Sequence, residues 1–255
     1  MTAQEFTNRL RGGDTVLGYW VVTDNPIGTE RIARAGYDYV ALDAQHGLIG
    51  YQGMLTGLLA IDASGSAAGV VRVEANNATP IGKALDAGAA AVIVPLINTA
   101  GDAAAAVAAT RYPPTGIRSY GPMRSGLRIG PTPAEVDDTV LVFAMIETPQ
   151  GLANVEEIAA TPGLDGLYVG PSDLTLALGG KTSTDPEVAK EFEAALIRIL
   201  TACTANNIVP GIHTASGEIA RRRIEAGFRL VSVASDLTHL EATAKAHLAG
   251  ARGEA

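Results

Sequence analysis

The chain has 255 residues, of which 47% are hydrophobic and 18% charged, and its formal net charge is −8. This apolar content excludes intrinsic disorder, and the length suits one large domain or two small ones. The net charge argues against nucleic acid or an anionic membrane as the main partner, because phosphate groups would meet a repulsive field.

The segment 1–13 begins the chain without the apolar run of a signal peptide. No stretch of the sequence reaches the roughly 18 uninterrupted apolar residues that a membrane helix needs. We therefore expect a cytoplasmic protein with no membrane partner.

Short apolar runs alternate along the chain with longer segments of helical pattern. Nearly all are apolar at consecutive positions, as expected when helices cover one face of a sheet and a core fills the other. The eight runs are 16–22, 39–44, 69–74, 91–96, 141–147, 166–170, 208–213 and 230–236. Four are preceded by a glycine suited to ending a helix, namely Gly36, Gly88, Gly163 and Gly227. The repetition predicts one (β/α)8 barrel domain over 1–255, with an open doubly wound sheet as the alternative.

The segment 111–138 breaks this rhythm between the fourth and fifth runs. It is rich in Pro, Gly and Arg and too long for an ordinary connection, so we expect an excursion from the barrel. Four arginines lie between Arg111 and Arg128. Phosphate binding, an interface loop and a solvated face all remain open as explanations for them.

Polar side chains gather at the C-terminal ends of the predicted strands, where a barrel places its active site. They are Asp43, Gln45 and His46 after the second run, Arg72 and Glu74 in the third, Glu147 after the fifth, Asp173 after the sixth, and His213 at the end of the seventh. Glu147 and Asp173 provide hard oxygen ligands on neighbouring strands, a set typical of Mg²⁺ or Mn²⁺. The alternative is that each carboxylate caps the helix that follows it.

Arg72 is a cation within a barrel strand, so it needs a partner or a place in the barrel mouth. Strand alternation puts Glu74 on the same side, which leaves a structural Arg72–Glu74 ion pair as the alternative. Asp43 and His46 have the spacing for a carboxylate to orient an imidazole on the following loop. A lone structural histidine is the alternative interpretation there.

The C-terminal helix-patterned segments contain the single cysteine and two further histidines. Cys203 repeats with Phe192, Leu196 and Ile199 at helical spacing, so we interpret it as core rather than as a reactive thiol. His239 and His247 are separated by more than two helical turns, too far to share one ion, and we interpret both as surface residues.

Several motifs together resemble the class II, metal-dependent 2-keto-acid aldolases of the HpcH/HpaI family. This group includes 4-hydroxy-2-oxoheptanedioate aldolase and 2-keto-3-deoxyglucarate aldolase. The likeness runs from about Gly18 to Asp236. The motifs are LDAQHG, VVRVE, LDAGAAAVIVPLINTAGDA, ATRYPPTGIRS, VPGIHT and the long block MIETPQGLANVEEIAATPGLDGLYVGPSDL.

The resemblance implies a carbon–carbon lyase that cleaves a 4-hydroxy-2-keto acid reversibly into pyruvate, or a related 2-keto acid, and an aldehyde. Glu147 and Asp173 would bind a divalent cation, Mg²⁺, Mn²⁺ or Co²⁺. Arg72 would hold the C2 oxygen and stabilise the enolate. The carboxylate would bind at the helix start formed by Gly170, Pro171 and Ser172.

In the same resemblance, His46, oriented by Asp43, would transfer the proton of the aldol hydroxyl. Three positions depart from the family pattern. Gln45 replaces a frequent Glu, Met145 replaces a Gln found in some members, and His213 stands where aliphatic residues are common. We expect His213 to shape the aldehyde side of the site.

Other enzyme classes fit the sequence less well. A Schiff-base aldolase needs a lysine inside the barrel, and the lysines fall on helical or loop segments, namely Lys83, Lys181, Lys190 and Lys245. A citryl- or malyl-thioester lyase on a related barrel also uses two carboxylates and a cation, and coenzyme A dependence would distinguish it. A non-catalytic barrel scaffold would not need the polar strand ends.

Two segments predict a homo-oligomer, from a dimer to a hexamer, with the active site near a subunit boundary. One is the excursion at 111–138. The other is the C-terminal segment 237–251, which resembles the exchanged last helix of the family.

Overall fold

Eight parallel strands form a closed barrel in which each strand pairs with the next and β8 pairs with β1. The strands are β1 Val16–Val21, β2 Tyr39–Asp43, β3 Ala68–Arg72, β4 Ala91–Val94, β5 Leu141–Ile146, β6 Gly166–Val169, β7 Val209–Thr214 and β8 Leu230–Ser235. The computed structural model describes residues 1–254. The predicted (β/α)8 barrel is confirmed, and the alternative prediction of an open doubly wound sheet is wrong.

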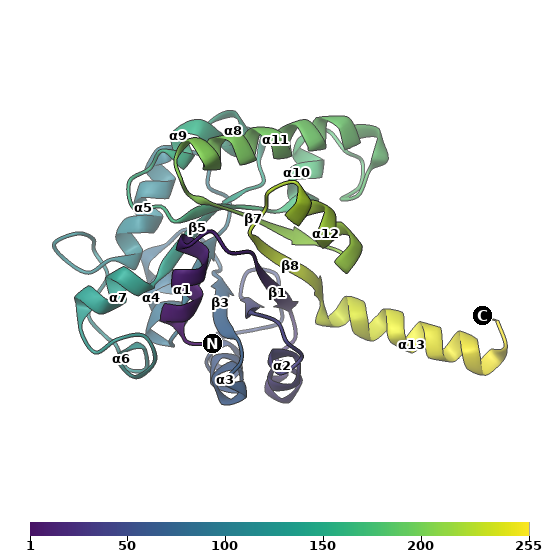
Figure 1. Ribbon diagram of the computed structural model, residues 1–255, viewed down its shortest axis with the longest axis horizontal. Helices are drawn as coiled ribbons and strands as arrows, with labels where there is room; N and C mark the ends of the chain where they lie inside the picture. Colours follow the sequence, from purple (N-terminus) through teal and green to yellow (C-terminus); the bar gives the residue numbers. More distant parts are fainter. Residues whose placement is uncertain (255) are drawn as a thin grey trace.

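Helices surround the strands (Figure 1). Their bounds are α1 Ala3–Arg11, α2 Pro26–Ala33, α3 Tyr51–Ser64, α4 Ala78–Asp86, α5 Ala100–Thr110, α6 Ser125–Arg128, α7 Pro133–Thr139, α8 Pro149–Ala153, α9 Val155–Ala159, α10 Pro171–Ala177, the 3₁₀ turn η1 Pro186–Val188, α11 Ala189–Ala205, α12 Gly217–Glu225 and α13 Asp236–Arg252. All four glycines predicted to end helices have a positive φ, for example 99° at Gly88 and 114° at Gly227.

Strand alternation determines which side chains point into the barrel, from its N-terminal end to its C-terminal mouth. Side chains of the inner cluster recur at every second residue, for example Tyr39 and Ala41 in β2 or Leu141, Phe143 and Met145 in β5. The next position of each inner series lies at the C-terminal mouth. Several of these mouth positions are polar, namely Asp43, Arg72, Glu147 and His213. At the opposite end, Phe6 and Leu10 of α1 belong to the same inner cluster.

The segment 111–138 lies between α5 and β5 and contains α6 and most of α7. Its four arginines pair with carboxylates of the same chain. These pairs are Arg111 with Asp165 at 3.1 Å, Arg118 with Asp86 at 2.7 Å, Arg128 with Asp62 at 2.9 Å, and Arg124 with Asp62. The pairs explain the arginines without a bound phosphate. They leave four large apolar side chains exposed, namely Ile117, Tyr120, Met123 and Leu127.

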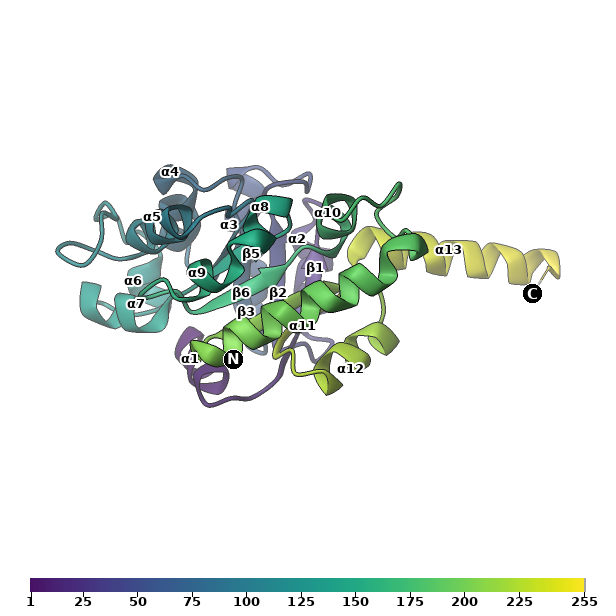
Figure 2. The same cartoon turned by 90° about the horizontal axis from the view of Figure 1, so that it is seen from above.

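The last helix, α13, extends away from the barrel in both views (Figures 1 and 2). None of its residues is buried. His239 and His247 are exposed, as expected, although His239 Nδ1 also lies 2.9 Å from the Tyr19 hydroxyl. Exchange of this helix between subunits stays a prediction. Within residues 1–254, no helix has both the length and the apolar character to cross a membrane.

Cys203 is fully buried in α11, which confirms its interpretation as a core residue. Burial raises the pKa of its thiol to about 12. The thiolate that would make it nucleophilic is therefore scarce at neutral pH.

Gly18 allows β1 and the Tyr39 ring to approach closely. A Cβ at this position would lie 2.1 Å from Tyr39 Cζ, and Tyr39 is fully buried against Phe6. Gly18→Ala should therefore lower the free energy of unfolding by about 1–3 kcal/mol in urea denaturation. Gly82→Ala is the matched control, because a Cβ there meets nothing within 4 Å in the middle of α4. It should be neutral or stabilise by up to about 1 kcal/mol.

Candidate active site

A cavity of about 240 Å³ opens at the C-terminal end of the barrel. Its wall contains most of the residues predicted from the strand ends, namely His46, Arg72, Gly170, Pro171, Ser172, Asp173 and His213. Asp43 and Glu147 are buried, with 1% and 3% of their surface exposed. We call this cavity the active-site pocket.

Asp43 and Arg72 form a two-point ion pair between the ends of adjacent strands. Arg72 donates from Nε to Asp43 Oδ1 at 2.9 Å and from Nη2 to Oδ2 at 2.5 Å. The register of β2 and β3 places the two residues side by side. Trp20 completes the group, because its Nε1 donates to Asp43 Oδ2 at 3.2 Å and the guanidinium lies 5.2 Å from its ring centroid.

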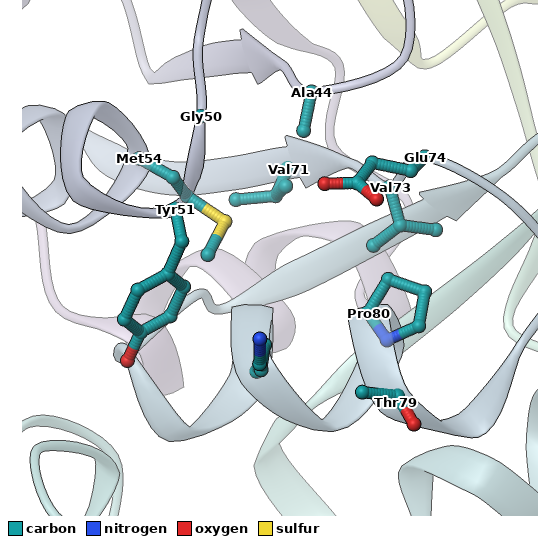
Figure 3. A pocket seen from close by; sticks show the side chains of 10 residues that line it. Ala44, Gly50, Tyr51, Met54, Val71, Val73, Glu74, Thr79 and Pro80 are labelled. Carbon is teal, nitrogen blue, oxygen red and sulfur yellow. The ribbon is translucent and has the colours of Figure 1, made fainter.

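The alternative ion pair between Arg72 and Glu74 is wrong. Strand β3 ends at Arg72, so alternation no longer governs the direction of Glu74. Figure 3 shows Glu74 in the wall of a neighbouring hollow, together with Tyr51 and Met54 of α3. The wall of that hollow includes neither Arg72 nor Asp43, the carboxylate that is paired with Arg72.

The contact predicted between the Asp43 carboxylate and the His46 imidazole also differs from the structure. Asp43 Oδ1 instead accepts the backbone N–H groups of Gln45 at 3.0 Å and His46 at 3.1 Å. Burial alone would raise the pKa of Asp43, but the hydrogen bonds and charge of Arg72 outweigh it and hold that pKa below its ordinary value. Asp43 therefore positions His46 through its backbone, and the exposed imidazole faces the active-site pocket.

Glu147 has the features of a cation ligand. Its Oε1 accepts the Leu96 N–H at 2.8 Å, whereas its buried Oε2 has no hydrogen-bond partner. Burial raises the pKa of Glu147, and the nearby Asp173 charge adds to that effect. An orphaned carboxylate oxygen beside a second carboxylate is costly unless a cation neutralises both. The pair fits a divalent cation that takes its other ligands from substrate and water.

The helix-capping alternative fails for both carboxylates. Thr148, not Glu147, caps α8, because its hydroxyl accepts the Gly151 N–H at 2.9 Å. Asp173 lies in the first turn of α10, where the structure has no side-chain cap. No cluster of three or more His, Cys, Asp or Glu side chains able to hold a metal occurs in residues 1–254.

Gly170 lets the start of α10 approach Glu147. A Cβ at this position would lie 2.4 Å from Glu147 Oε2 and 2.7 Å from Met145 Cε. Three residues were predicted to bind the substrate carboxylate through their N–H groups. Pro171 has no N–H group, so only Gly170 and Ser172 could donate to it. The missing side chain keeps the space beside Glu147 Oε2 open.

His213, predicted to shape the site, lies in the pocket wall in a fixed position. Its Nδ1 is 3.2 Å from Ser232 Oγ, which also hydrogen bonds with the Tyr168 hydroxyl. Burial lowers the pKa of His213 to about 4, and the Arg72 charge acts in the same direction. His213 is therefore uncharged at neutral pH and provides a hydrogen-bonding aromatic wall.

Sequence reasoning missed Trp20, Tyr168 and Ser232. Each occupies an inner strand position, but its neighbours on the outer face are also apolar, so periodicity alone does not distinguish the two faces. Tyrosine, tryptophan and serine inside a barrel need hydrogen-bond partners. That requirement could have indicated from the sequence that these three residues lie near the polar residues of the barrel mouth.

The chain matches the HpcH/HpaI aldolase/citrate lyase family over residues 17–242. It is 38% identical to the hydroxypyruvate/pyruvate aldolase of Rhizorhabdus wittichii over 94% of this chain and 95% of that one. It is also 38% identical to the 5-keto-4-deoxy-D-glucarate aldolase of Klebsiella pneumoniae over 91% of each chain. A solved HpcH/HpaI aldolase/citrate lyase family structure from Burkholderia cenocepacia has 33% identity and a TM-score of 0.87, covering 98% of this chain and 99% of that one.

The chain belongs to the HpcH/HpaI aldolase/citrate lyase family. It is a class II aldolase, which confirms the enzyme class inferred from the sequence. Enzymes of this family depend on a divalent cation. The structure agrees with a mechanism that lacks a Schiff base, because all four lysines are exposed.

Replacement of Glu147 should reveal the cost of its buried charge. A raised pKa means that the folded protein binds this proton more tightly than the unfolded chain, so the wild type loses stability as the pH rises past 4.5, its ordinary value. Glu147→Gln should therefore increase the free energy of unfolding of metal-free protein at pH 7.5. The gain should shrink as the pH approaches 4.5, where wild-type Glu147 becomes protonated in both states.

The control for Glu147→Gln is the same denaturation with added Mg²⁺. The cation should stabilise the wild type and leave the variant nearly unchanged, because ligand binding to the folded state raises stability by mass action. A variant less stable than the wild type at every pH would contradict the assignment of a costly ionised carboxylate.

Proposed function

We propose that this enzyme catalyses reversible aldol cleavage of a 4-hydroxy-2-keto acid into pyruvate or a related 2-keto acid and an aldehyde. The observation that carries the proposal is the buried, unpartnered Oε2 of Glu147, close to Asp173, which lines the active-site pocket together with Arg72. The names of the aldolase relatives support a pyruvate-type product, and one of them includes hydroxypyruvate.

Glu147 and Asp173 would hold the divalent cation, Mg²⁺, Mn²⁺ or Co²⁺. When bound, the cation would supply Lewis-acid polarisation of the 2-keto group. The carboxyl group of the substrate would meet the N–H groups at the start of α10, from Gly170 and Ser172. This arrangement would fix the keto acid between β5 and β6 at the end of the barrel.

Arg72 would stabilise the negative charge that develops on the C2 oxygen as the C3–C4 bond breaks. The pair with Asp43 occupies the Nε donor and one Nη2 donor, so three of the five guanidinium N–H groups are left for a substrate oxygen. Because Asp43 holds the guanidinium in place, little reorganisation is needed during the reaction.

His46 would accept the proton of the C4 hydroxyl, directly or through water, and return it in the condensation direction. Its imidazole faces the active-site pocket, and Asp43 fixes the backbone from which it extends. His213 and Trp20 would line the side of the pocket toward the departing aldehyde.

Cation dependence is the direct test of this proposal. Chelation should abolish cleavage of 4-hydroxy-2-keto acids, and Mg²⁺, Mn²⁺ or Co²⁺ should restore it without coenzyme A. Borohydride with pyruvate should give no covalent adduct by mass spectrometry. Full activity in protein shown to be free of metal would contradict the proposal, and a strict need for coenzyme A would favour the thioester lyase alternative.

Separate kinetics should distinguish the roles of Arg72 and His46. Arg72→Lys should slow both aldol cleavage and proton exchange at C3 of pyruvate, because both reactions pass through the enolate and lysine lacks the planar fork. His46→Ala should slow cleavage by roughly 10²–10⁴-fold and exchange much less. Equal losses in both reactions for His46→Ala would instead make it the base for enolisation.

We also propose that the chain forms a homo-oligomer, at least a dimer. The support is the projecting helix α13, whose Leu237, Leu240 and Leu248 are 44–67% exposed, and a cavity of about 460 Å³ beside its first turns. Light scattering should give a mass above that of one 26.2 kDa chain. A fully active monomer at working concentration would refute this proposal.

A further inference from the structure

A second cavity, of about 370 Å³, adjoins the active-site pocket and shares Pro171, Ser172 and His213 with it as wall residues. The rest of its wall comes from α10, the connection through η1, the first turns of α11, the end of β7 with Ala215, and α12. All three helices contact β7, and Figure 2 shows them next to one another. We call this space the outer cavity.

His213 separates the outer cavity from the active-site pocket as a neutral aromatic wall. Its ring is held from two sides, by Ser232 Oγ at 3.2 Å and by an edge contact to Trp20 with 5.2 Å between centroids. An uncharged ring presents no ionic barrier to an apolar group that passes along it. The two spaces therefore adjoin along an uncharged surface at His213.

Several charged and hydroxyl groups around the outer cavity are already hydrogen bonded within the protein. Arg223 donates two hydrogen bonds of 2.7 Å to Glu193, so the two charges compensate. The hydroxyls of Thr175 and Thr214 donate to the carbonyls of Pro171 and Ser232, at 2.7 and 2.8 Å. An anionic ligand would lose water here without gaining a free cation, because Arg223 is already paired with Glu193. The hydroxyls of Ser172, Ser183 and Thr184 are further polar groups of the wall.

Apolar side chains also line the outer cavity. They are Pro186, Ala189, Phe192, Ile212, Ala215 and Ile219. An aliphatic or aryl group bound against them would leave water without giving up hydrogen bonds. The composition of the wall thus favours an uncharged apolar ligand.

We propose that the outer cavity is the acceptor subsite and binds the apolar tail, aliphatic or aryl, of the aldehyde substrate. This inference rests on the proposed aldolase function. In condensation, C3 of the enolate forms a bond to the aldehyde carbon, and the carbonyl oxygen takes a proton to become the C4 hydroxyl. The tail takes no part in these bond changes, so the subsite would set acceptor choice and leave the chemistry unchanged.

Filling the outer cavity is the first test. Ala215→Phe should lower kcat/KM for condensation of pyruvate with 3-phenylpropanal at least tenfold. The kcat/KM for glycolaldehyde, which has no tail, should stay within twofold of the wild-type value. Ala194→Phe is the matched control, because Ala194 is exposed on α11 outside the cavity wall, and it should change neither value. Equal losses for both aldehydes, or no loss for 3-phenylpropanal, would overturn the proposal.

A second measurement uses the wild-type enzyme and needs no variant to fold. Hexanal should have a kcat/KM at least tenfold above that of 6-oxohexanoate, which has the same length but ends in a carboxylate. Equal values or a preference for the carboxylate would overturn the apolar subsite. Metal-dependent condensation with glycolaldehyde tests the aldolase function separately, so failure of the subsite would be distinguishable from failure of that function.

Discussion

The ion pair between Asp43 and Arg72 is the interaction on which the rest of the site depends. Both side chains are nearly removed from water, with 2% and 8% of their surfaces exposed. Desolvation of two such charges is expensive, and good geometry with additional hydrogen bonds is needed to offset it. Trp20 and the backbone of residues 45 and 46 supply those bonds. The same contacts place the guanidinium, the His46 loop and the indole around one pocket.

The low dielectric of the barrel mouth affects three neighbouring groups differently. The pKa of Asp43 is lowered because Arg72 outweighs burial, that of Glu147 is raised by burial and Asp173, and that of His213 is lowered by burial and Arg72. Arg72 therefore keeps the Asp43 carboxylate ionised, whereas burial, with a further contribution from Arg72, keeps the His213 imidazole neutral. The Glu147 carboxylate is left with an uncompensated charge, which a divalent cation would neutralise.

The sequence was sufficient to predict the barrel and most of the residues in its mouth. Apolar runs mark parallel strands covered on both faces, and polar residues at their ends stand out against that background. The partners of these residues were harder to predict. Alternation suggested that Arg72 pairs with Glu74, but β3 ends at Arg72, and the parallel register with β2 supplies Asp43 instead. Trp20 and Ser232 were missed because both faces of their strands are apolar.

The central claim is that Asp43 and Arg72 act as one unit, and a double-mutant cycle tests it most directly. The free energy of unfolding would be measured by urea denaturation for Asp43→Ala, Arg72→Met and the double variant. Asp43→Ala should cost about 3–5 kcal/mol, because it leaves a buried guanidinium unpaired. The double variant should be more stable than Asp43→Ala, since it removes that unpaired charge. Additive losses would show that the two side chains stabilise the barrel mouth independently and would contradict the claim.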